Sequence, residues 1–268
     1  MTILITGATN GLGAYLATQL VKAGEDVVAH GRNPERLRRL SEELGVSTVQ
    51  ADLTDLSQVD RLADEISGRF DRLDVLVNNA GIGTGPDPSR REESADGIEL
   101  RFAVNYLAGY HLTRRLVPLL TASAPSRVVN VSSAGQQAID FADPQLTKSY
   151  DGGRAYRQSK LAQIMFTIDL AGELREAGVT VNALHPATLM PTTMVREAGR
   201  RVMSTLDEGG SAVLRLITDP EPAPVTGAYF DGTARSEPDT QASSADARGQ
   251  LRTLSEALVA TALDRRAG

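Results

Sequence analysis

Short runs of β-branched and apolar residues alternate with helical patterns, and this alternation limits the fold more than any other feature of the chain. Six such runs stand at residues 2–6, 27–30, 46–50, 73–77, 127–132 and 179–184. Strands that alternate with amphipathic helices form right-handed crossovers, which place the strands parallel in one sheet between two helix layers. A chain of 268 residues can form one large domain of this kind. The sequence therefore predicts a single, doubly wound α/β domain over residues 1–268.

Local signals mark where helices begin and end. Asn33-Pro34 provides a capping residue and a proline at a helix start, and Gly45 and Gly178 stand where helices should stop. After the sixth run the alternation loosens. We expect a substrate lid at about 187–226, because a long ordered loop in a compact domain is usually functional. A C-terminal helix is expected at about 244–263.

The composition argues against several classes of function. A formal net charge of −6 disfavours a surface that binds nucleic acid. The chain has no cysteine and three scattered histidines, so no disulfide framework and no metal site are expected. No apolar run approaches the roughly 20 residues that span a bilayer, and no basic-then-apolar leader precedes the first run. We expect a cytoplasmic protein without a membrane partner.

A glycine-rich turn at residues 6–13, TGATNGLG, follows the first run and leads into a helical pattern. Backbone amides at a helix start point toward an anion, and glycines let a pyrophosphate approach the backbone. Gly7, Gly11 and Gly13 do not have the G-x-G-x-x-G spacing of the general dinucleotide fingerprint. A tight strand-to-helix turn also needs glycine for backbone reasons alone. The position between a strand and a helix favours a phosphate site over the plain turn.

The end of the second run indicates which dinucleotide binds. A carboxylate at this place holds the ribose diol of NAD, whereas the 2′-phosphate of NADP needs cationic donors. The sequence here is His30-Gly31-Arg32-Asn33, without an acid. The guanidinium of Arg32 can present a planar fork to a phosphate, which favours NADP. In the alternative interpretation, Arg32 is a solvated residue near a helix start and Gly31 belongs to a turn.

Tyr156 and Lys160 stand four residues apart in a helical pattern, so their side chains share one face. A phenol with an ordinary pKa of about 10 transfers protons poorly near neutral pH. A nearby ammonium, together with the positive ring of an oxidised nicotinamide, favours the phenolate and lowers that pKa. The compact ammonium can also hydrogen-bond ribose hydroxyls. Because such pairs also occur by chance on solvated helix faces, this one needs a partner residue.

Ser133 is the candidate partner. It follows the run at 127–132, within the segment VVNVSSAG. Its hydroxyl can hydrogen-bond the substrate oxygen on which negative charge develops. For an isolated Ser-Ser pair, a simple turn after a strand is the alternative.

Taken together and in this order, these segments resemble the short-chain dehydrogenases/reductases. The match covers residues 2 to about 232, and its pieces are TGATNGLG, Asp52-Leu53, NNAG at 78–81, Asn105, Ser133, Tyr156-x-x-x-Lys160 and His185-Pro186. Within the family, the segment around Tyr156, YFDG at 229–232 and LRTLSEALV at 251–259 resemble the retinol-dehydrogenase-like carbonyl reductases. The resemblance implies a Rossmann fold with a central, mostly parallel, seven-stranded sheet and helices on both faces.

The resemblance also implies roles for the matching positions. Tyr156 would be the general acid in reduction, Ser133 the partner of the carbonyl oxygen, Lys160 the ribose anchor, and Asn105 the support of a proton-relay water. For Asn105 and Asn79 the alternative is a buried amide that satisfies backbone groups. The implied cofactor-binding positions are Gly7, Thr9, Asn10, Gly11, Leu12, Gly13, Arg32, Asp52, Leu53, Asn79, Ala80, Gly81, Tyr156, Lys160, Pro186, Leu189 and Thr192.

The sequence departs from the family pattern near the expected nicotinamide. The family commonly has Pro-Gly followed by a threonine, whereas this chain reads HPATLMPTTM at 185–194. Ala187 replaces the glycine, and Pro191 shifts the threonine to Thr192.

A second departure lies before Tyr156. The 22 residues between Ser133 and Tyr156 exceed the length in compact family members, and they include a rival pair, Tyr150 and Arg154. Two glycines between the members of this pair disfavour a helix that would juxtapose them. Tyr156 is therefore kept as the candidate acid.

These residues predict an NADP(H)-dependent carbonyl reductase that moves hydride between NADPH and a ketone or aldehyde, reversibly with an alcohol. A non-catalytic NADP sensor is the alternative, although a sensor does not need the serine, the tyrosine and the lysine together. A nucleotide-sugar epimerase or dehydratase would have a different glycine spacing and a larger C-terminal part.

The substrate and the oligomeric state are less constrained. Apolar residues of the lid favour an apolar or aromatic small molecule, or else they only pack the lid onto the sheet. Family members often pair through the helices that bear Asn105 and Tyr156. A homodimer and a homotetramer therefore stand beside a monomer as alternatives.

Overall fold

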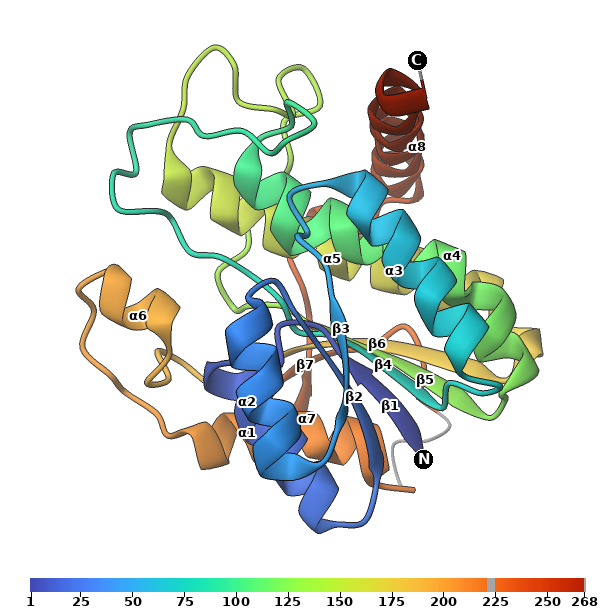
Figure 1. The fold of residues 1–268 in the computed structure, drawn as a ribbon. Helices are drawn as coiled ribbons and strands as arrows, with labels where there is room; N and C mark the ends of the chain where they lie inside the picture. The colour runs from blue at the N-terminus through green and yellow to red at the C-terminus, as the bar shows by residue number, and fades with distance from the viewer. Residues whose placement is uncertain (221–224, 268) are drawn as a thin grey trace.

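The computed structural model describes residues 1–220 and 225–267, and the strands within these ranges form one sheet (Figure 1). Its order is β3-β2-β1-β4-β5-β6-β7-β8, and every neighbouring pair is parallel except the last. The strands are β1 (Thr2–Ile5), β2 (Asp26–Gly31), β3 (Ser47–Gln50), β4 (Val75–Asn78), β5 (Ser126–Val131), β6 (Val179–His185), β7 (Tyr229–Asp231) and β8 (Ala234–Ser236).

The predicted doubly wound parallel sheet is confirmed, and each of the six predicted strands is present. In the described ranges the sheet has eight strands rather than the expected seven. The chain turns back after β7 at Gly232, whose φ is +58°, and the short β8 pairs antiparallel with β7, placing Arg235 opposite Phe230. A left-handed backbone conformation of this kind favours glycine, because glycine has no Cβ.

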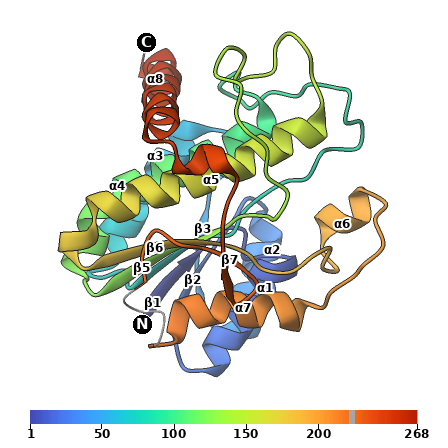
Figure 2. The same ribbon diagram turned by 180° about the vertical axis from the view of Figure 1, so that it is seen from behind.

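Helices cover both faces of the sheet (Figure 2). One apolar core joins the sheet to α1, α2 and α7, and the other joins it to α3, α4, α5 and α8. The helices are α1 (Gly11–Lys22), α2 (Pro34–Leu44), α3 (Leu56–Arg69), a π-helical turn η1 (Phe102–Leu107), α4 (Ala108–Ala122), α5 (Gly152–Glu173), η2 (Arg175–Ala177), α6 (Thr193–Glu197), α7 (Leu206–Thr218), η3 (Thr240–Ser243) and α8 (Ala245–Ala267).

The predicted helix boundaries follow from local chemistry. The side chain of Asn33 accepts a hydrogen bond from the amide of Arg36 and so caps α2, with Pro34 at its first position. Gly45 ends α2 with a φ of +70°, and Gly178 ends η2, just after α5, with a φ of +71°. Both are left-handed caps, which glycine adopts most easily.

The segment predicted as a lid divides into two parts. Residues 187–205, with the short α6, project beside the carboxyl ends of the strands in both views. Helix α7 instead packs in the helix layer against α1, and it buries Val213, Leu216 and Ile217 in the core. For these apolar residues the structure agrees with the alternative that the lid residues pack onto the sheet. Residues 221–224 of the predicted lid lie outside the described residues.

The C-terminal helix begins one residue after the predicted start and extends beyond the predicted end, as α8. It packs against α3 and α5. None of the helices in the described ranges is both long and apolar enough to cross a bilayer.

The strand order places a crevice at the switch point of the sheet. From β1 the chain winds outward to β3, and from β4 it winds the other way to β7. Loops after β1 and β4 therefore leave the sheet in opposite directions and open a crevice at the carboxyl ends of these strands, where open α/β sheets bind ligands. The glycine turn follows β1 and the segment 78–81 reaches past the end of β4, so both line this crevice.

Candidate active site

The glycine turn is closely packed beneath the crevice. A Cβ on Gly7, whose φ is +67°, would stand 3.0 Å from the Cα of Ala80. A Cβ on Gly13 would stand 2.6 Å from the side-chain amide nitrogen of Asn79. Asn79 donates from that amide to the oxygens of Thr6 (2.8 Å) and Gly7 (3.3 Å). The half-buried amide of Asn79 thus satisfies backbone groups, as in the structural alternative, and the same bonds fix the loop after β4 to the glycine turn.

The remaining residues of the turn have separate tasks. Asn10 caps α1 by accepting from the amide of Gly11, and its own amide donates to the hydroxyl of Thr193. A Cβ on Gly11 would stand 3.2 Å from the methyl group of Thr192. Thr192, an implied cofactor-binding position, therefore lies against the glycine turn. The side chain of Leu12 is buried and supports the start of the helix.

His30 supports the turn, although it was not among the predicted site residues. The backbone amide of Gly7 donates to Nδ1 of His30 (3.3 Å), and Nε2 lies 3.1 Å from the oxygen of Ala51. These contacts require a neutral ring with the proton on Nε2. Burial lowers the pKa of His30 to about 4, which keeps the ring neutral. In the sequence, the only signal for this role of His30 was a histidine near the carboxyl end of a buried strand.

Directly after β2 stands an exposed Arg32. Within residues 1–220 and 225–267, the guanidinium of Arg32 forms no ion pair or side-chain hydrogen bond. A Cβ on Gly31 would stand 2.7 Å from the methyl group of Thr9, so the backbone of Gly31 passes close to the side chain of Thr9. Asp52 accepts from the amide of Thr54 (3.0 Å). The described chain therefore leaves the cation of Arg32 available to an anionic ligand.

Further predicted residues line the crevice on its other wall. Leu53, Ala80 and Asn105 border a cavity of about 250 Å³ between the sheet and α4. A Cβ on Gly81 would stand 3.5 Å from Nζ of Lys160, so glycine keeps the space beside the ammonium open. Such a cradle fits the sugar of a dinucleotide. Pro186 is buried directly after β6.

Leu189 has a left-handed backbone with a φ of +50°. This conformation costs a leucine free energy, and residues held in it often lie at functional sites. Its backbone oxygen accepts from the amide of Met203 (3.1 Å), which fixes the start of the lid.

Tyr156 and Lys160 lie on one face of α5, as predicted. Nζ of Lys160 lies 5.9 Å from the centre of the Tyr156 ring. Ser133 reaches the same place from the end of β5, because Tyr156 and Ser133 share a hydrogen bond and both lie within 4.0 Å of where a Cβ on Gly135 would stand. The structure thus brings the three predicted catalytic side chains together at the carboxyl end of the sheet.

Burial dominates the electrostatics of these side chains. Burial raises the pKa of Tyr156, and the hydrogen bond with Ser133 opposes this change only in part. Burial also lowers the pKa of Lys160, to about 7. Burial of the phenol is therefore the largest influence on its pKa in the protein alone, and the predicted lowering, which also involves the positive ring of an oxidised nicotinamide, stays a prediction.

Asn105 lies in the π-helical turn η1 that precedes α4. Its side chain accepts from the amide of Ile82 (2.7 Å) and donates to the oxygen of Ile82 (3.1 Å) and to the hydroxyl of Ser159 (3.0 Å). These bonds join the loop after β4 to α5. Single π-turns are frequent at functional sites, and here the structural alternative and the position beside Lys160 coincide.

The rival Tyr150 is held elsewhere. Its hydroxyl donates to Oε1 of Glu99 (2.9 Å) and accepts from Nη1 of Arg101 (3.1 Å). Burial and Glu99 raise the pKa of Tyr150. Arg101 is 1% exposed, and it also donates to the backbone oxygens of Gly83 and Thr84, both at 3.1 Å. The tyrosine therefore belongs to a buried network that shapes the loop after β4, and sequence reasoning did not find this network.

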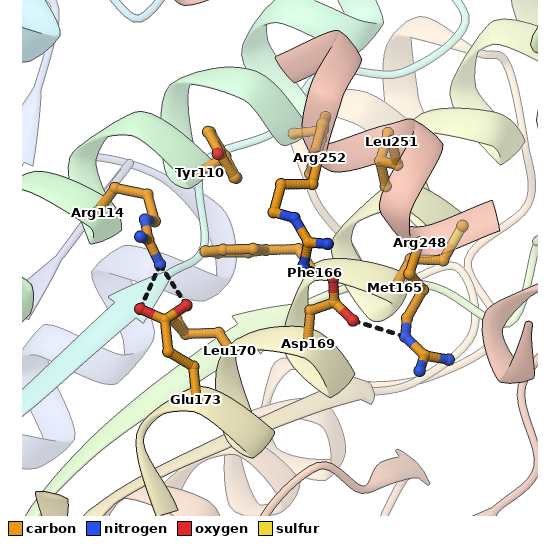
Figure 3. A pocket seen from close by; sticks show the side chains of 11 residues that line it. Tyr110, Arg114, Met165, Phe166, Asp169, Leu170, Glu173, Arg248, Leu251 and Arg252 are labelled. Atoms are coloured by element: carbon orange, nitrogen blue, oxygen red, sulfur yellow. Dashed lines mark hydrogen bonds and ion pairs between the residues drawn. The ribbon is translucent and has the colours of Figure 1, made fainter. Parts of the chain in front are cut away.

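A second groove of about 340 Å³ lies between α4, α5 and α8 (Figure 3). Its floor contains Phe166 and Tyr110, and its rim carries the ion pairs of Arg114 with Glu173 and of Arg248 with Asp169. None of the predicted site residues lines it.

The fold and the site together define an oxidoreductase of the dinucleotide-binding class. A family model described as short chain dehydrogenase matches residues 1–202, and the chain belongs to this family.

The chain is 33% identical to retinol dehydrogenase 13 of Mus musculus over 98% of this chain and 84% of that protein. It is 35% identical to retinol dehydrogenase 14 of Homo sapiens over 88% and 79%, respectively. The structure of 3-ketoacyl-(acyl-carrier-protein) reductase from Brucella melitensis, complexed with NADH, has a TM-score of 0.68 and 26% identity and covers 86% of this chain and 95% of that chain. The predicted resemblance is thereby confirmed.

Proposed function

We propose that this protein is an NADP(H)-dependent carbonyl reductase that interconverts a ketone or aldehyde with the corresponding alcohol. The observation that carries the proposal is the meeting of Ser133, Tyr156 and Lys160 at the crevice beside the glycine turn. A protein that only binds a dinucleotide needs the turn but not these three groups.

The residues divide the work of reduction. When bound, the nicotinamide supplies the hydride that reaches the carbonyl carbon. Tyr156 donates its phenolic proton to the carbonyl oxygen, and the hydroxyl of Ser133 hydrogen-bonds that oxygen as negative charge develops on it. The ammonium of Lys160 faces the open space at Gly81, where ribose hydroxyls can accept its protons, and its charge favours the phenolate that Tyr156 leaves behind.

The preference for NADP rests on Arg32. Its exposed guanidinium has no anionic partner in the described chain, and no carboxylate ends β2. We expect Arg32→Ser to weaken the binding of NADPH by about 10-fold or more, since hydrogen bonds to charged groups contribute about 1.5–3 kcal/mol. The binding of NADH should hardly change, because NADH lacks the 2′-phosphate. Titrations of both nucleotides by fluorescence measure this, and equal losses for both would contradict the preference.

The substrate is proposed to be an apolar carbonyl compound. Met194 of α6 reaches across to the loop after β4, because a Cβ on Gly83 would stand 2.8 Å from its Cγ. Val202 and Met203 of the same lid segment are exposed. The names of the relatives point to retinoids, so retinaldehyde is the first compound to test.

The test is to follow NADPH absorbance with retinaldehyde, aromatic ketones, and small polar aldehydes as controls. We expect oxidation of NADPH with at least one apolar compound, at a higher kcat/KM than with the polar controls. If no carbonyl compound supports oxidation, although NADPH binds, the proposal of a reductase is wrong.

A further inference from the structure

Lys160 is held in a buried place by two acceptors. The residue is 3% exposed. Nζ donates to the backbone oxygen of Val131 and to Oε1 of Gln163, both at 3.0 Å. An ammonium has three protons to donate. The third is left for the crevice, where Gly81 keeps space open beside Nζ.

The other groups around this ammonium are neutral or share its sign. Tyr156 faces it from α5, and His185 approaches from β6, where the charge of Lys160 helps to lower the pKa of the imidazole. Asp231 of β7 acts on His185 in the opposite direction. In the part of the chain that the structure describes, burial is the cause of the lowered pKa of Lys160, and no carboxylate counters it.

Gln163 is thus the one side chain of the described residues that hydrogen-bonds the ammonium of Lys160. It is 4% exposed and stands three residues further along α5. It also lines the cavity of about 250 Å³ that Asn78 and Asn105 border. The amide oxygen is a dipole that accepts a proton without carrying a net charge.

We propose that Gln163 is a positioning residue for Lys160: its amide oxygen holds the ammonium at the crevice in the protonated form without cancelling its positive charge. A carboxylate at this position would neutralise the charge that Tyr156 needs. An alkyl group would leave the ammonium with a single acceptor in an apolar place, where the neutral amine is favoured. The catalytic meaning of this role rests on the proposed function, whereas the hydrogen bond acts on Lys160 whether or not the protein turns over a substrate.

The chain offers a direct test, because it contains only three lysines. Lys22 and Lys148 are exposed, and Lys160 is buried. In cofactor-free protein labelled with 13C-lysine, NMR can follow each titration, and the Lys160→Met variant identifies the signal of Lys160. We expect that signal to titrate near pH 7, well below the ordinary value of about 10.4 for a lysine side chain.

Two variants of Gln163 should move this titration in opposite directions. Gln163→Met keeps the length of the side chain but removes the acceptor, so the charged amine loses stabilisation and its midpoint should fall by about one pH unit. Gln163→Glu supplies a negative charge, so the midpoint should rise by about one unit or more. Circular dichroism of each variant verifies folding, and if one variant does not fold the other still decides.

The same midpoint in the wild type and in every folded variant would overturn the proposal. A merely structural role would lower stability without this opposite movement. As a second readout, the alkaline limb of kcat/KM should shift in the same directions, because reduction needs the charged lysine. If the wild type reduces no carbonyl compound, the proposed function fails, but the lysine titration still decides the role of Gln163.

Discussion

Tyr156→Phe is expected to lower kcat for carbonyl reduction by about 10²–10⁴-fold, the usual contribution of a positioned general acid. Phenylalanine keeps the ring and its packing on α5 but removes the hydroxyl that pairs with Ser133. The carbonyl oxygen would then have no proton donor as hydride arrives at the carbon. Stopped-flow measurement of NADPH oxidation in a single turnover separates this loss from slow product release.

Two controls make the result specific. NADPH should bind Tyr156→Phe nearly as tightly as the wild type, since the glycine turn, Arg32 and Lys160 are unchanged. Tyr150→Phe is the matched variant, because it removes a hydroxyl that bonds Glu99 and Arg101 outside the crevice. Its kcat should be close to the wild-type value. Turnover retained by Tyr156→Phe would remove this phenol from the mechanism.

Arg101→Leu is expected to lower the free energy of unfolding by about 3–5 kcal/mol, the typical effect of removing one partner from a buried ion pair. Arg101 and Glu99 are each 1% exposed, and the side chain of Glu99 also accepts from the amide of Phe102 (2.7 Å). Without the guanidinium, the carboxylate and the backbone oxygens of Gly83 and Thr84 would be buried with fewer donors. Urea unfolding at neutral pH measures the change.

Arg114→Leu is the matched control. Its guanidinium pairs with Glu173 at the exposed rim of the groove between α4, α5 and α8. Exposed ion pairs contribute about 0–1 kcal/mol, so this variant should stay close to the wild type. A loss for Arg101→Leu as small as the loss for Arg114→Leu would mean that water or another donor satisfies the buried network.

The sequence predicted the parts of the molecule that depend on local spacing. A separation of four residues on a helix places the side chains of Tyr156 and Lys160 on one face, whatever surrounds them. The alternation of strands and helices leaves few possible topologies. That restriction placed the turn of Gly7 and the end of β5 at the same side of the sheet, where the parallel strands have their carboxyl ends. The family pattern is shifted at Thr192, and its place against Gly11 became visible only in the structure.

The amino-acid composition could not distinguish a substrate lid from a helix of the layer that covers the sheet. The apolar residues of α7 have the same chemistry as those of a substrate lid, and only their contact with α1 shows that they belong to the core. The eighth strand was missed because β8 is three residues long, and a strand of that length has no periodicity that a sequence can reveal.

The sequence by itself determined the fold class, the glycine turn after β1 and the helix face that Tyr156 and Lys160 share, because neighbours along the chain fix each of them. Tertiary structure alone decided how acidic those side chains are and what holds them. Burial is the largest influence on the pKa of Tyr156, and the ammonium of Lys160 donates a hydrogen bond to the backbone oxygen of Val131, 29 residues away along the chain. Arg101 donates a hydrogen bond to the hydroxyl of Tyr150, which stands 49 residues further along the chain. Desolvation and such contacts depend on distances in space, which local patterns do not contain.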